Sequence, residues 1–248
     1  MQDLKISIVT VCYNAESTIL DCIKSVFDQD YKNIEYIIID GGSTDKTVEF
    51  VLGYSGQLTH FVSEPDNGIY DAINKGIKMA SGDIVGILNA DDYFPESNIL
   101  TTIAETFTQT GADVIYGNLD YVNTHGRILR KWRSGNFKRR NFRLGWMPPH
   151  PTFYCKRDLF KRYGFYSLNF GTAGDYELML RFLYVNSPKV SYINKVLVKM
   201  RVGGQSNQNL ANRKKAMAND LKAMRLHGIS VPLLTLFLKP ARKLTQYR

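Results

Sequence analysis

Short β-branched runs alternate with helix-patterned segments over the first half of the chain, and this alternation constrains the fold most. The strand-like runs cover residues 6–11, 34–40, 58–62, 84–88 and 112–116. Apolar residues recur at helical spacing between them, as at Ile19, Ile23 and Val26 or at Ile73 and Ile77. Strands that alternate with helices build βαβ units. We therefore expect an α/β fold with a mostly parallel central sheet and helices on both faces.

The composition of the 248 residues is that of a globular protein. The chain is 44% hydrophobic with 13 Phe and 15 Tyr, which is too apolar for a disordered chain. Its three cysteines, Cys12, Cys22 and Cys155, form no Cys-x-x-Cys pair, so neither a zinc site nor a disulfide framework is indicated. We expect reduced thiols, a cytoplasmic protein, no signal peptide and no membrane-spanning run.

The formal net charge of +9 is concentrated at the C-terminal end. Residues 201–248 hold ten Lys and Arg against a single acid, Asp220, and the first 200 residues are balanced. A second basic cluster covers residues 127–143. Such patches attract phosphates on lipids, nucleotides or nucleic acids.

The basic tail has three interpretations. It is a solvated charged helix, a nucleic-acid surface or a membrane surface. No interleaved aromatic residues or known motif support nucleic-acid binding, so no nucleic-acid partner is expected. An apolar run at 231–238 precedes Lys239, Arg242 and Lys243. This arrangement favours an interfacial membrane segment within residues 229–248.

Polar clusters follow three of the predicted strands. Residues 10–14 end the first strand, Asp40 ends the second, and Asn89, Asp91 and Asp92 follow the fourth. Ligands of parallel α/β sheets bind at the carboxyl ends of the strands, so the three clusters are expected to converge. The paired aspartates suit Mg²⁺ or Mn²⁺ carrying phosphates, or else form a turn that caps the next helix near residue 95.

Asp40 has two interpretations as well. It either caps the helix that follows the 41–42 glycine turn or accepts hydrogen bonds from a base or a ribose. The chain has neither a Gly-x-Gly-x-x-Gly pattern nor a Walker A pattern, which argues against a dinucleotide fold and a P-loop NTPase.

The order of these motifs resembles a known family. The segments 7–14, 40–45, 64–76, 80–83 and 88–92 are similar, in sequence and in spacing, to the family 2 glycosyltransferases of the GT-A fold. These are inverting enzymes that use nucleotide-diphosphate sugars. The resemblance is dense over residues 5–118 and continues to about residue 205.

The resemblance implies roles for residues of the first half. Asp40 would bind the base, and the metal motif would hold Mg²⁺ or Mn²⁺ through Asp91 and Asp92. Asn89 departs from the common Asp-x-Asp form, which puts the strength and identity of the metal in doubt. The nucleotide-sugar site as a whole would include Thr10, Val11, Tyr13, Glu16, Asp40, Asp66, Asn67, Lys75, Asn89, Ala90, Asp91 and Arg201.

The second half supplies the candidate base. Inversion needs a carboxylate that deprotonates the acceptor hydroxyl, and Asp175 in Gly174-Asp175-Tyr176-Glu177 matches the acidic motif of the family. The alternative is that Asp175 only stabilises the N-terminus of a helix, a role that Glu177 could equally have. His150 is assigned to the metal or the diphosphate, or else has a structural role.

Two further features of the second half have both a functional and a structural interpretation. Arg201, with a loop at residues 203–206, would neutralise the leaving diphosphate or lie on the surface. Trp132 and Trp146 would stack on sugars or pack in the core.

Together these features predict a GT-A domain over residues 1–205, divided into a nucleotide-sugar half (1–118) and an acceptor half (119–205). A helical basic tail at 206–248 would follow. The predicted reaction moves a hexose or N-acetylhexosamine, most simply from a UDP-sugar, to a saccharide or polyprenyl-linked acceptor at the inner face of the cell membrane. The product would be a surface polysaccharide such as a capsule or O-antigen.

A catalytically silent nucleotide-sugar or membrane-binding subunit is the alternative to this function. A sugar-1-phosphate nucleotidyltransferase is disfavoured, because residues 12–16 lack the glycine-rich basic loop that it needs. The sequence leaves the oligomeric state open.

Overall fold

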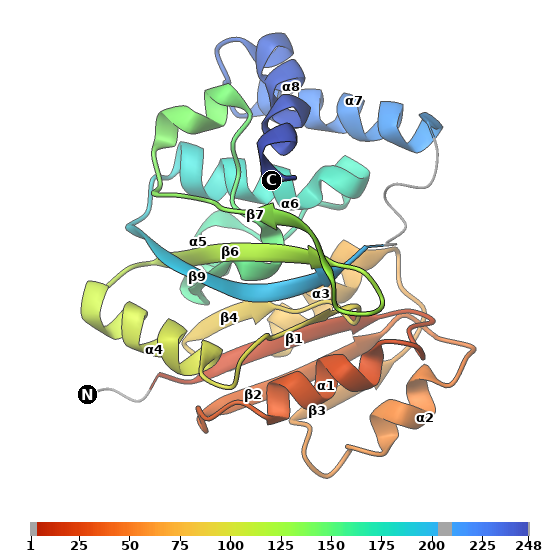
Figure 1. The fold of residues 1–248 in the computed structure, drawn as a ribbon. Helices are drawn as coiled ribbons and strands as arrows, with labels where there is room; N and C mark the ends of the chain where they lie inside the picture. The colour runs from red at the N-terminus through yellow and green to blue at the C-terminus, as the bar shows by residue number, and fades with distance from the viewer. Residues whose placement is uncertain (1–3, 203–209, 248) are drawn as a thin grey trace.

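The computed structural model describes residues 4–202 and 210–247. Its centre is a nine-stranded sheet in the order β3-β2-β1-β4-β8-β6-β9-β5, with β7 paired to β6 (Figure 1). The strands are β1 (Ile6–Cys12), β2 (Ile34–Asp40), β3 (His60–Ser63), β4 (Ile84–Ile87), β5 (Asp92–Tyr93), β6 (Val114–Val122), β7 (Ile128–Trp132), β8 (Tyr154–Lys156) and β9 (Val190–Arg201).

The first half of the sheet is parallel, as the strand–helix alternation predicts. β1 lies between β2 and β4, and β3 follows β2 in the same direction. The side chains of β1 and β2 alternate between two cores because successive strand residues point to opposite faces. Val9 and Ile37 belong to one core, and Ile8 and Ile38 belong to the other.

Helices cover both faces of the sheet, which confirms the α/β fold. One core includes α1 (Ile19–Phe27), α2 (Thr47–Leu52) and α4 (Ile99–Thr110). The other includes α3 (Ile69–Met79), α5 (Asp158–Tyr163) and α6 (Gly174–Met179). α4 begins after Asn98, later than the start at Pro95 that the sequence suggested.

The second half of the sheet is mixed. β8 runs antiparallel to both β4 and β6, and β6 runs parallel to β9. β5 and β7 add antiparallel pairs at β9 and β6. Residues 154–156 form a short strand, and α5 begins directly after it at Asp158. The strand predicted at 112–116 extends as β6 to Val122.

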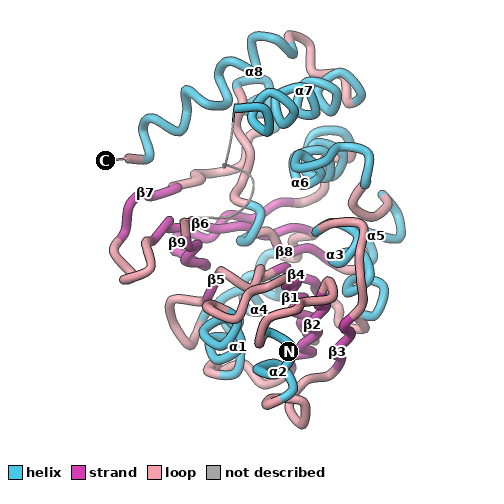
Figure 2. Tube along the Cα trace, turned by 90° about the vertical axis from the view of Figure 1, so that its right-hand side faces the viewer, coloured by secondary structure: helices cyan, strands magenta, loops and turns pink. Residues whose placement is uncertain are grey.

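Two C-terminal helices complete the molecule. α7 (Leu210–Leu226) and α8 (Pro232–Ala241) pack against α6 and the short helix η1 (Arg139–Leu144) (Figures 1 and 2). Met224, Ile229 and Leu236 are buried in the same core as α3 and α6. The basic tail is therefore built into the fold through its apolar residues. The predicted boundary at 205/206 and the start of a helix at residue 208 lie outside the described residues.

Gly145 shows how closely the tail approaches the rest of the chain. A Cβ at this position would lie 2.5 Å from the backbone nitrogen of Lys239 in α8, and the residue has a φ of +74°. Only glycine takes this conformation readily and leaves room for the α8 backbone.

Across residues 4–202 and 210–247, no helix combines the length and the apolar character that crossing a membrane requires.

Candidate active site

The carboxyl ends of β1, β2 and β4 meet, as the sequence predicted. The Gly41 amide donates to the Cys12 carbonyl at 2.9 Å, and the Ala90 amide donates to the Val11 carbonyl at 3.2 Å. The side chain of Asn14 joins the first two loops, since its Oδ1 accepts from the Thr44 amide at 2.9 Å. Residues far apart in the sequence therefore form one edge of the sheet.

Asp40 is buried at this edge and organises the turn that follows β2. Its Oδ2 accepts hydrogen bonds from the amides of Gly42 (3.1 Å) and Ser43 (2.9 Å) and from the Ser63 hydroxyl (2.7 Å). Burial raises the pKa of Asp40, but hydrogen bonds from Ser43 and Ser63 outweigh it and lower the pKa below its usual value. These contacts fit the turn-capping interpretation, and binding of a base by Asp40 stays a prediction.

Tyr13, Gly41 and Asp66 form the exposed surface of this edge. The Tyr13 side chain is 56% exposed although it is aromatic. A Cβ at Gly41 would lie 2.5 Å from Asp66 Oδ2 and 3.5 Å from the Tyr13 ring. The missing side chain at position 41 lets the ring and the carboxylate approach each other. The result is an open aromatic face beside an acceptor, where a flat base can stack and hydrogen-bond.

Several other residues predicted to bind the nucleotide-sugar have side chains that contact other parts of the protein. Thr10 is buried, with its hydroxyl 3.1 Å from that of Tyr36. Glu16 accepts from the Lys46 amide at 3.0 Å. Lys75 pairs with Glu64 at 2.9 Å. Val11 and Ala90 are buried. The backbone amide of Asn67 donates to Asp71 at 3.0 Å. The side chains of Thr10 and Val11 thus do not join the exposed face of Tyr13.

The acidic turn after β4 holds two carboxyl groups and an amide. Asp92 is buried, and its Oδ2 accepts from Asn89 Nδ2 at 3.1 Å. Oδ1 of Asp92 and Oδ1 of Asn89 are both buried without a hydrogen-bond donor. Burial raises the pKa of Asp91 and of Asp92, and the neighbouring charge of Asp91 raises that of Asp92 further.

Arg201 lies across the acidic turn because β5 pairs with the end of β9. Its guanidinium is 2.5 Å from Asp21, donates to the Asp91 carbonyl at 3.4 Å and stacks 4.8 Å from the Tyr93 ring. The structure thus brings Arg201 to the predicted metal motif. The loop predicted to close over the donor, at residues 203–206, lies outside the described residues.

Asp175 lies in the first turn of α6. Its Oδ1 accepts from the Tyr176 amide at 2.7 Å and from the Tyr70 hydroxyl at 3.3 Å. Its Oδ2 accepts no hydrogen bond from any residue that the structure describes. A Cβ at Gly174 would lie 2.7 Å from the Tyr70 ring, so the glycine permits this contact between α3 and α6.

His150 is linked to Asp175 through the side chains of Tyr166 and Tyr70. Its Nε2 is 2.8 Å from the hydroxyl of Tyr166, whose ring stacks on Tyr70 at 5.5 Å. Burial lowers the pKa of His150, and the charge of Asp175 partly offsets the effect. Among the residues described, no three His, Cys, Asp or Glu side chains form a metal cluster. The contacts of His150 fit the structural interpretation, and its assignment to the metal stays a prediction.

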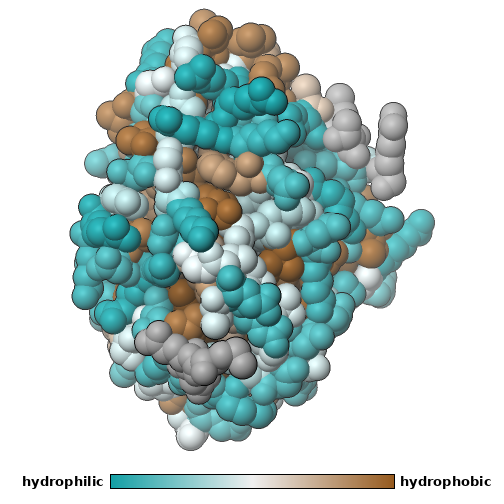
Figure 3. All heavy atoms as spheres, turned by 90° about the vertical axis from the view of Figure 1, so that its left-hand side faces the viewer, coloured by the Kyte–Doolittle hydropathy of each residue, from teal (hydrophilic) through white to brown (hydrophobic). Residues whose placement is uncertain are grey.

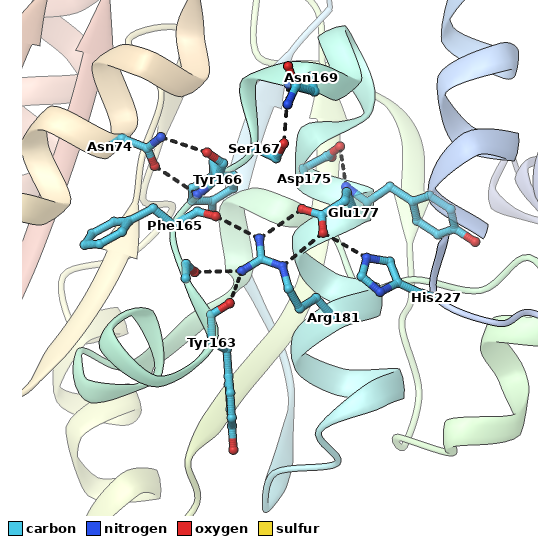
Figure 4. Close-up of polar contacts among 12 residues, drawn as sticks. Asn74, Tyr163, Phe165, Tyr166, Ser167, Asn169, Asp175, Glu177, Arg181 and His227 are labelled. Atoms are coloured by element: carbon cyan, nitrogen blue, oxygen red, sulfur yellow. Dashed lines mark hydrogen bonds and ion pairs between the residues drawn. The ribbon is translucent and has the colours of Figure 1, made fainter. Parts of the chain in front are cut away.

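Glu177, the second acid of this motif, is fully engaged (Figure 4). Its Oε1 accepts from Arg181 Nε at 2.9 Å and lies 2.8 Å from His227 Nε2, and its Oε2 lies 2.9 Å from Arg181 Nη2. Burial raises the pKa of Glu177, but the hydrogen bonds from His227 and Arg181 lower it overall. With both oxygens engaged, Glu177 is unsuited to accept a substrate proton.

Arg181 extends this network to the segment that carries Tyr166. Its guanidinium donates to the carbonyls of Tyr163, Gly164 and Phe165. The Tyr166 amide in turn donates to Asn74 on α3 at 2.9 Å. The network fixes α6, and with it Asp175, against α3 and α7.

Some of these supporting residues were missed by sequence reasoning. The Glu177–Arg181 spacing of four residues was a visible signal of an ion pair. Tyr70, Tyr166 and His227 gave none, because their contacts depend on helix packing. Trp146 packs in the core as the structural interpretation expected, and Trp132 stacks on Tyr121 at 6.4 Å.

Comparison with known proteins agrees with this architecture. The family model described as glycosyl transferase family 2 matches residues 7–165, so the chain belongs to that family. An uncharacterized glycosyltransferase of Mycobacterium tuberculosis is 32% identical over 193 residues, which cover 74% of this chain and 70% of the relative.

Solved structures show the same GT-A fold. Residues 1–349 of S. aureus TarS in complex with UDP-GlcNAc superpose with a TM-score of 0.69 at 21% identity, covering 97% of this chain and 69% of that one. Against a longer TarS chain the match covers only 40% of the relative. The mannosyltransferase PcManGT from Pyrobaculum calidifontis, in complex with GDP-Man and Mn²⁺, gives a TM-score of 0.68 at 17% identity, with 98% and 74% covered. The chain is a glycosyltransferase.

The buried ion pair at Arg181 should contribute far more to stability than an exposed pair of the same spacing. Arg181→Met leaves the Glu177 carboxylate buried, so we expect it to lower the free energy of unfolding by about 3–5 kcal/mol. The matched pair joins Arg162 to Asp158, and both of these side chains are at least half exposed (50% and 62%). Arg162→Met should cost about 0–1 kcal/mol. Urea unfolding of both variants measures the difference, and equal losses would contradict this account of α6.

Proposed function

We propose that this glycosyltransferase inverts the anomeric centre of a nucleotide-diphosphate sugar, with Asp175 as the base. The observation that supports this most is the difference in hydrogen bonding between the two acids of α6. Among the described residues, one oxygen of Asp175 accepts no hydrogen bond, whereas both oxygens of Glu177 are engaged. A general base needs an oxygen that can accept the proton of the substrate.

The donor is a nucleotide-diphosphate hexose or N-acetylhexosamine, and we propose a UDP-sugar. The edge formed by Tyr13, Gly41 and Asp66 supports a nucleoside at this position, because it offers an open aromatic face next to a carboxylate. The solved relatives agree on the class of donor, since one was solved with UDP-GlcNAc and the other with GDP-Man. The preference for uridine rests on the family resemblance.

The acidic turn fits a divalent cation, Mg²⁺ or Mn²⁺. The two carboxyl groups of Asp91 and Asp92 are close enough to raise the pKa of Asp92. The oxygens without donors at Asp92 and Asn89 are the hard ligands that these ions prefer. Such ions bind through one or two carboxylates and the phosphates of the substrate, so a third protein acid is not needed. When bound, the cation would supply positive charge to the leaving diphosphate.

The side chains of the protein have separate roles in the proposed reaction. Asp175 takes the proton of the acceptor hydroxyl as the hydroxyl oxygen attacks the anomeric carbon. The bond from that carbon to the diphosphate breaks, and the new glycosidic bond forms on the opposite face, so the anomeric configuration is inverted. Tyr70 orients Asp175 through its hydrogen bond, and Arg201 adds positive charge beside the acidic turn.

Replacement of the base tests the proposal directly. Asp175→Asn keeps the shape of the side chain but cannot accept the proton, so transfer should fall by about 10²–10⁴-fold. Asp158→Asn removes a similar helix acid that is 62% exposed and should leave the rate unchanged. Rates are measured as acceptor-dependent release of nucleoside diphosphate. Full activity of Asp175→Asn would eliminate this assignment, whereas UDP binding without transfer by the wild type would favour a silent subunit.

We further propose that α8 attaches the enzyme to the inner face of the cell membrane, where a polyprenyl-linked or saccharide acceptor would be presented. Three apolar side chains of the helix, Leu233, Leu234 and Phe237, are more than half exposed. Hydrophobic residues gather at the end of the molecule that carries α8 (Figure 3). Arg242 and Lys243 follow the helix and are exposed, and basic residues beside an apolar face favour anionic lipid.

Point substitutions test this surface better than a deletion, because removing residues 229–248 would take Ile229 and Leu236 out of the core. Leu233→Ser should weaken binding to phosphatidylglycerol vesicles several-fold in co-sedimentation. Leu52→Ser is the matched control, since Leu52 on α2 is 52% exposed and Leu233 is 55% exposed. Equal vesicle binding by the two variants would show that α8 is not the membrane surface.

A further inference from the structure

Arg130 on β7 is a buried cation whose guanidinium is incompletely bonded. The residue is 9% exposed, and its Nε and Nη2 are buried without a hydrogen-bond partner. In the part of the chain that the structure describes, no ion pair joins Arg130 to a carboxylate. A guanidinium is rarely buried without an anion, because its desolvation is then uncompensated.

Aromatic rings hold this guanidinium in place. It lies 3.9 Å from the ring centre of Tyr121, its partner across the β6–β7 pair, and 5.2 Å from that of Trp132. The ring of Tyr247, near the C-terminal end, lies 5.9 Å away. Cation–π contacts of this kind fix the position of the group but leave its N–H donors unused.

A second cation comes from the C-terminal segment. Partial burial, and then the charges of Arg130 and Lys239, lower the pKa of Lys243. Lys239 already pairs with Asp220 at 2.7 Å. The acids that act on Lys243 are Asp220 and Asp175. Lys243 lies on the short helix η6 (Arg242–Gln246), which packs against β7 and so brings Lys243 to the strand of Arg130, and Asp220 is already engaged with Lys239.

The position of this pair separates it from the nucleoside surface. Tyr121, the cross-strand partner of Arg130, lies opposite Met200 of β9, and Met200 lies opposite Asp92 of β5, so Arg130 is in the same cross-strand row as the acidic turn. The Tyr13 surface belongs to β1 and β2 at one side of the sheet, whereas β7 is attached to β6 beyond β4 and β8. In Figure 1 the C-terminal end lies over β7. Arg130 is thus in the predicted acceptor half, and Lys243 reaches it from the C-terminal tail.

We propose that Arg130 and Lys243 bind a phosphate group carried by the acceptor. The inference rests on the proposed function and adds the chemical class of the acceptor. The two unused N–H groups of Arg130 can donate in parallel to two phosphate oxygens, which is the geometry that guanidinium prefers. Lys243 adds a second positive charge. Phosphate on a polyprenyl carrier and phosphate within a saccharide share this chemistry.

Calorimetric titration with inorganic phosphate and with octyl phosphate tests the site, with UDP titrated in parallel. The wild type should bind both phosphates, and Arg130→Met should weaken this binding at least tenfold while UDP affinity is kept. Lys131→Met is the matched control, because Lys131 is the next residue of β7, is exposed and carries the same charge. It should bind phosphate as the wild type does. Tighter binding of octyl phosphate than of phosphate would assign the group to a lipid carrier, and equal binding would assign it to the saccharide.

The outcomes separate this proposal from the donor proposal. Phosphate binding that is absent in the wild type, or unchanged in Arg130→Met, would overturn the acceptor site. A parallel loss of UDP affinity in Arg130→Met would overturn it too, since the cation would then serve the donor. Absence of UDP binding in the wild type, with phosphate binding intact, would instead reject the donor proposal.

Thermal unfolding excludes a trivial loss of fold. Phosphate should raise the Tm of the wild type and of Lys131→Met but not that of Arg130→Met. Arg130→Met itself should unfold no earlier than the wild type in phosphate-free buffer, because it removes a buried charge that lacks an ionic partner. Earlier unfolding together with a retained phosphate shift would mean that Arg130 only supports the fold.

Discussion

The parallel register of β1 with β2 and β4 is the constraint on which the site depends. Cys12 lies opposite Asp40, so the first two strands end at the same level. The Ala90 amide then joins the loop after β4 to β1. Three loops that carry polar residues are thereby fixed at one edge, where backbone groups leave the sheet and side chains can meet a ligand. Asp40 secures this edge by using its carboxylate within the turn rather than leaving it open.

The acceptor half is attached to this edge by packing between helices. Tyr70 on α3 reaches Asp175 on α6, and Gly174 leaves the space for its ring. The contact between Arg181 and Glu177 fixes the same helix. The contact of His227 with Glu177 joins α7 to it. The predicted base therefore has a fixed position relative to the donor edge because of contacts among α3, α6 and α7. The C-terminal helices belong to this arrangement as much as to any membrane surface.

The sequence predicted the parallel half of the fold well, because each strand there is an apolar run with a helix after it. Residues 34–40 match β2 in full. β8 escaped prediction because it has only three residues and gains its stability from β4 and β6, which are distant in the sequence. The convergence of residues 10–14, 40 and 89–92 followed from topology alone.

The site was less predictable where side-chain packing decides it. The sequence assigned the role of base to Asp175, but it did not show how the surroundings of Asp175 and Glu177 differ, since both are acids of one helix turn. Their difference arises from Arg181 and from His227, a residue 50 positions away from Glu177. The contact of His150 with Tyr166 was equally unpredictable, because it depends on how the second half of the chain folds back, and the assignment of His150 to a metal stays a prediction.

The central claim is that the edge formed by β1, β2 and β4 binds a nucleoside diphosphate through a divalent cation. Calorimetric titration of UDP, GDP, dTDP and CMP, each with and without Mn²⁺, tests it most directly. The account predicts that one nucleoside diphosphate binds, that Mn²⁺ strengthens its binding, and that Asp91→Asn removes the effect of Mn²⁺. Folded protein that binds none of these nucleotides, with or without Mn²⁺, would contradict the account.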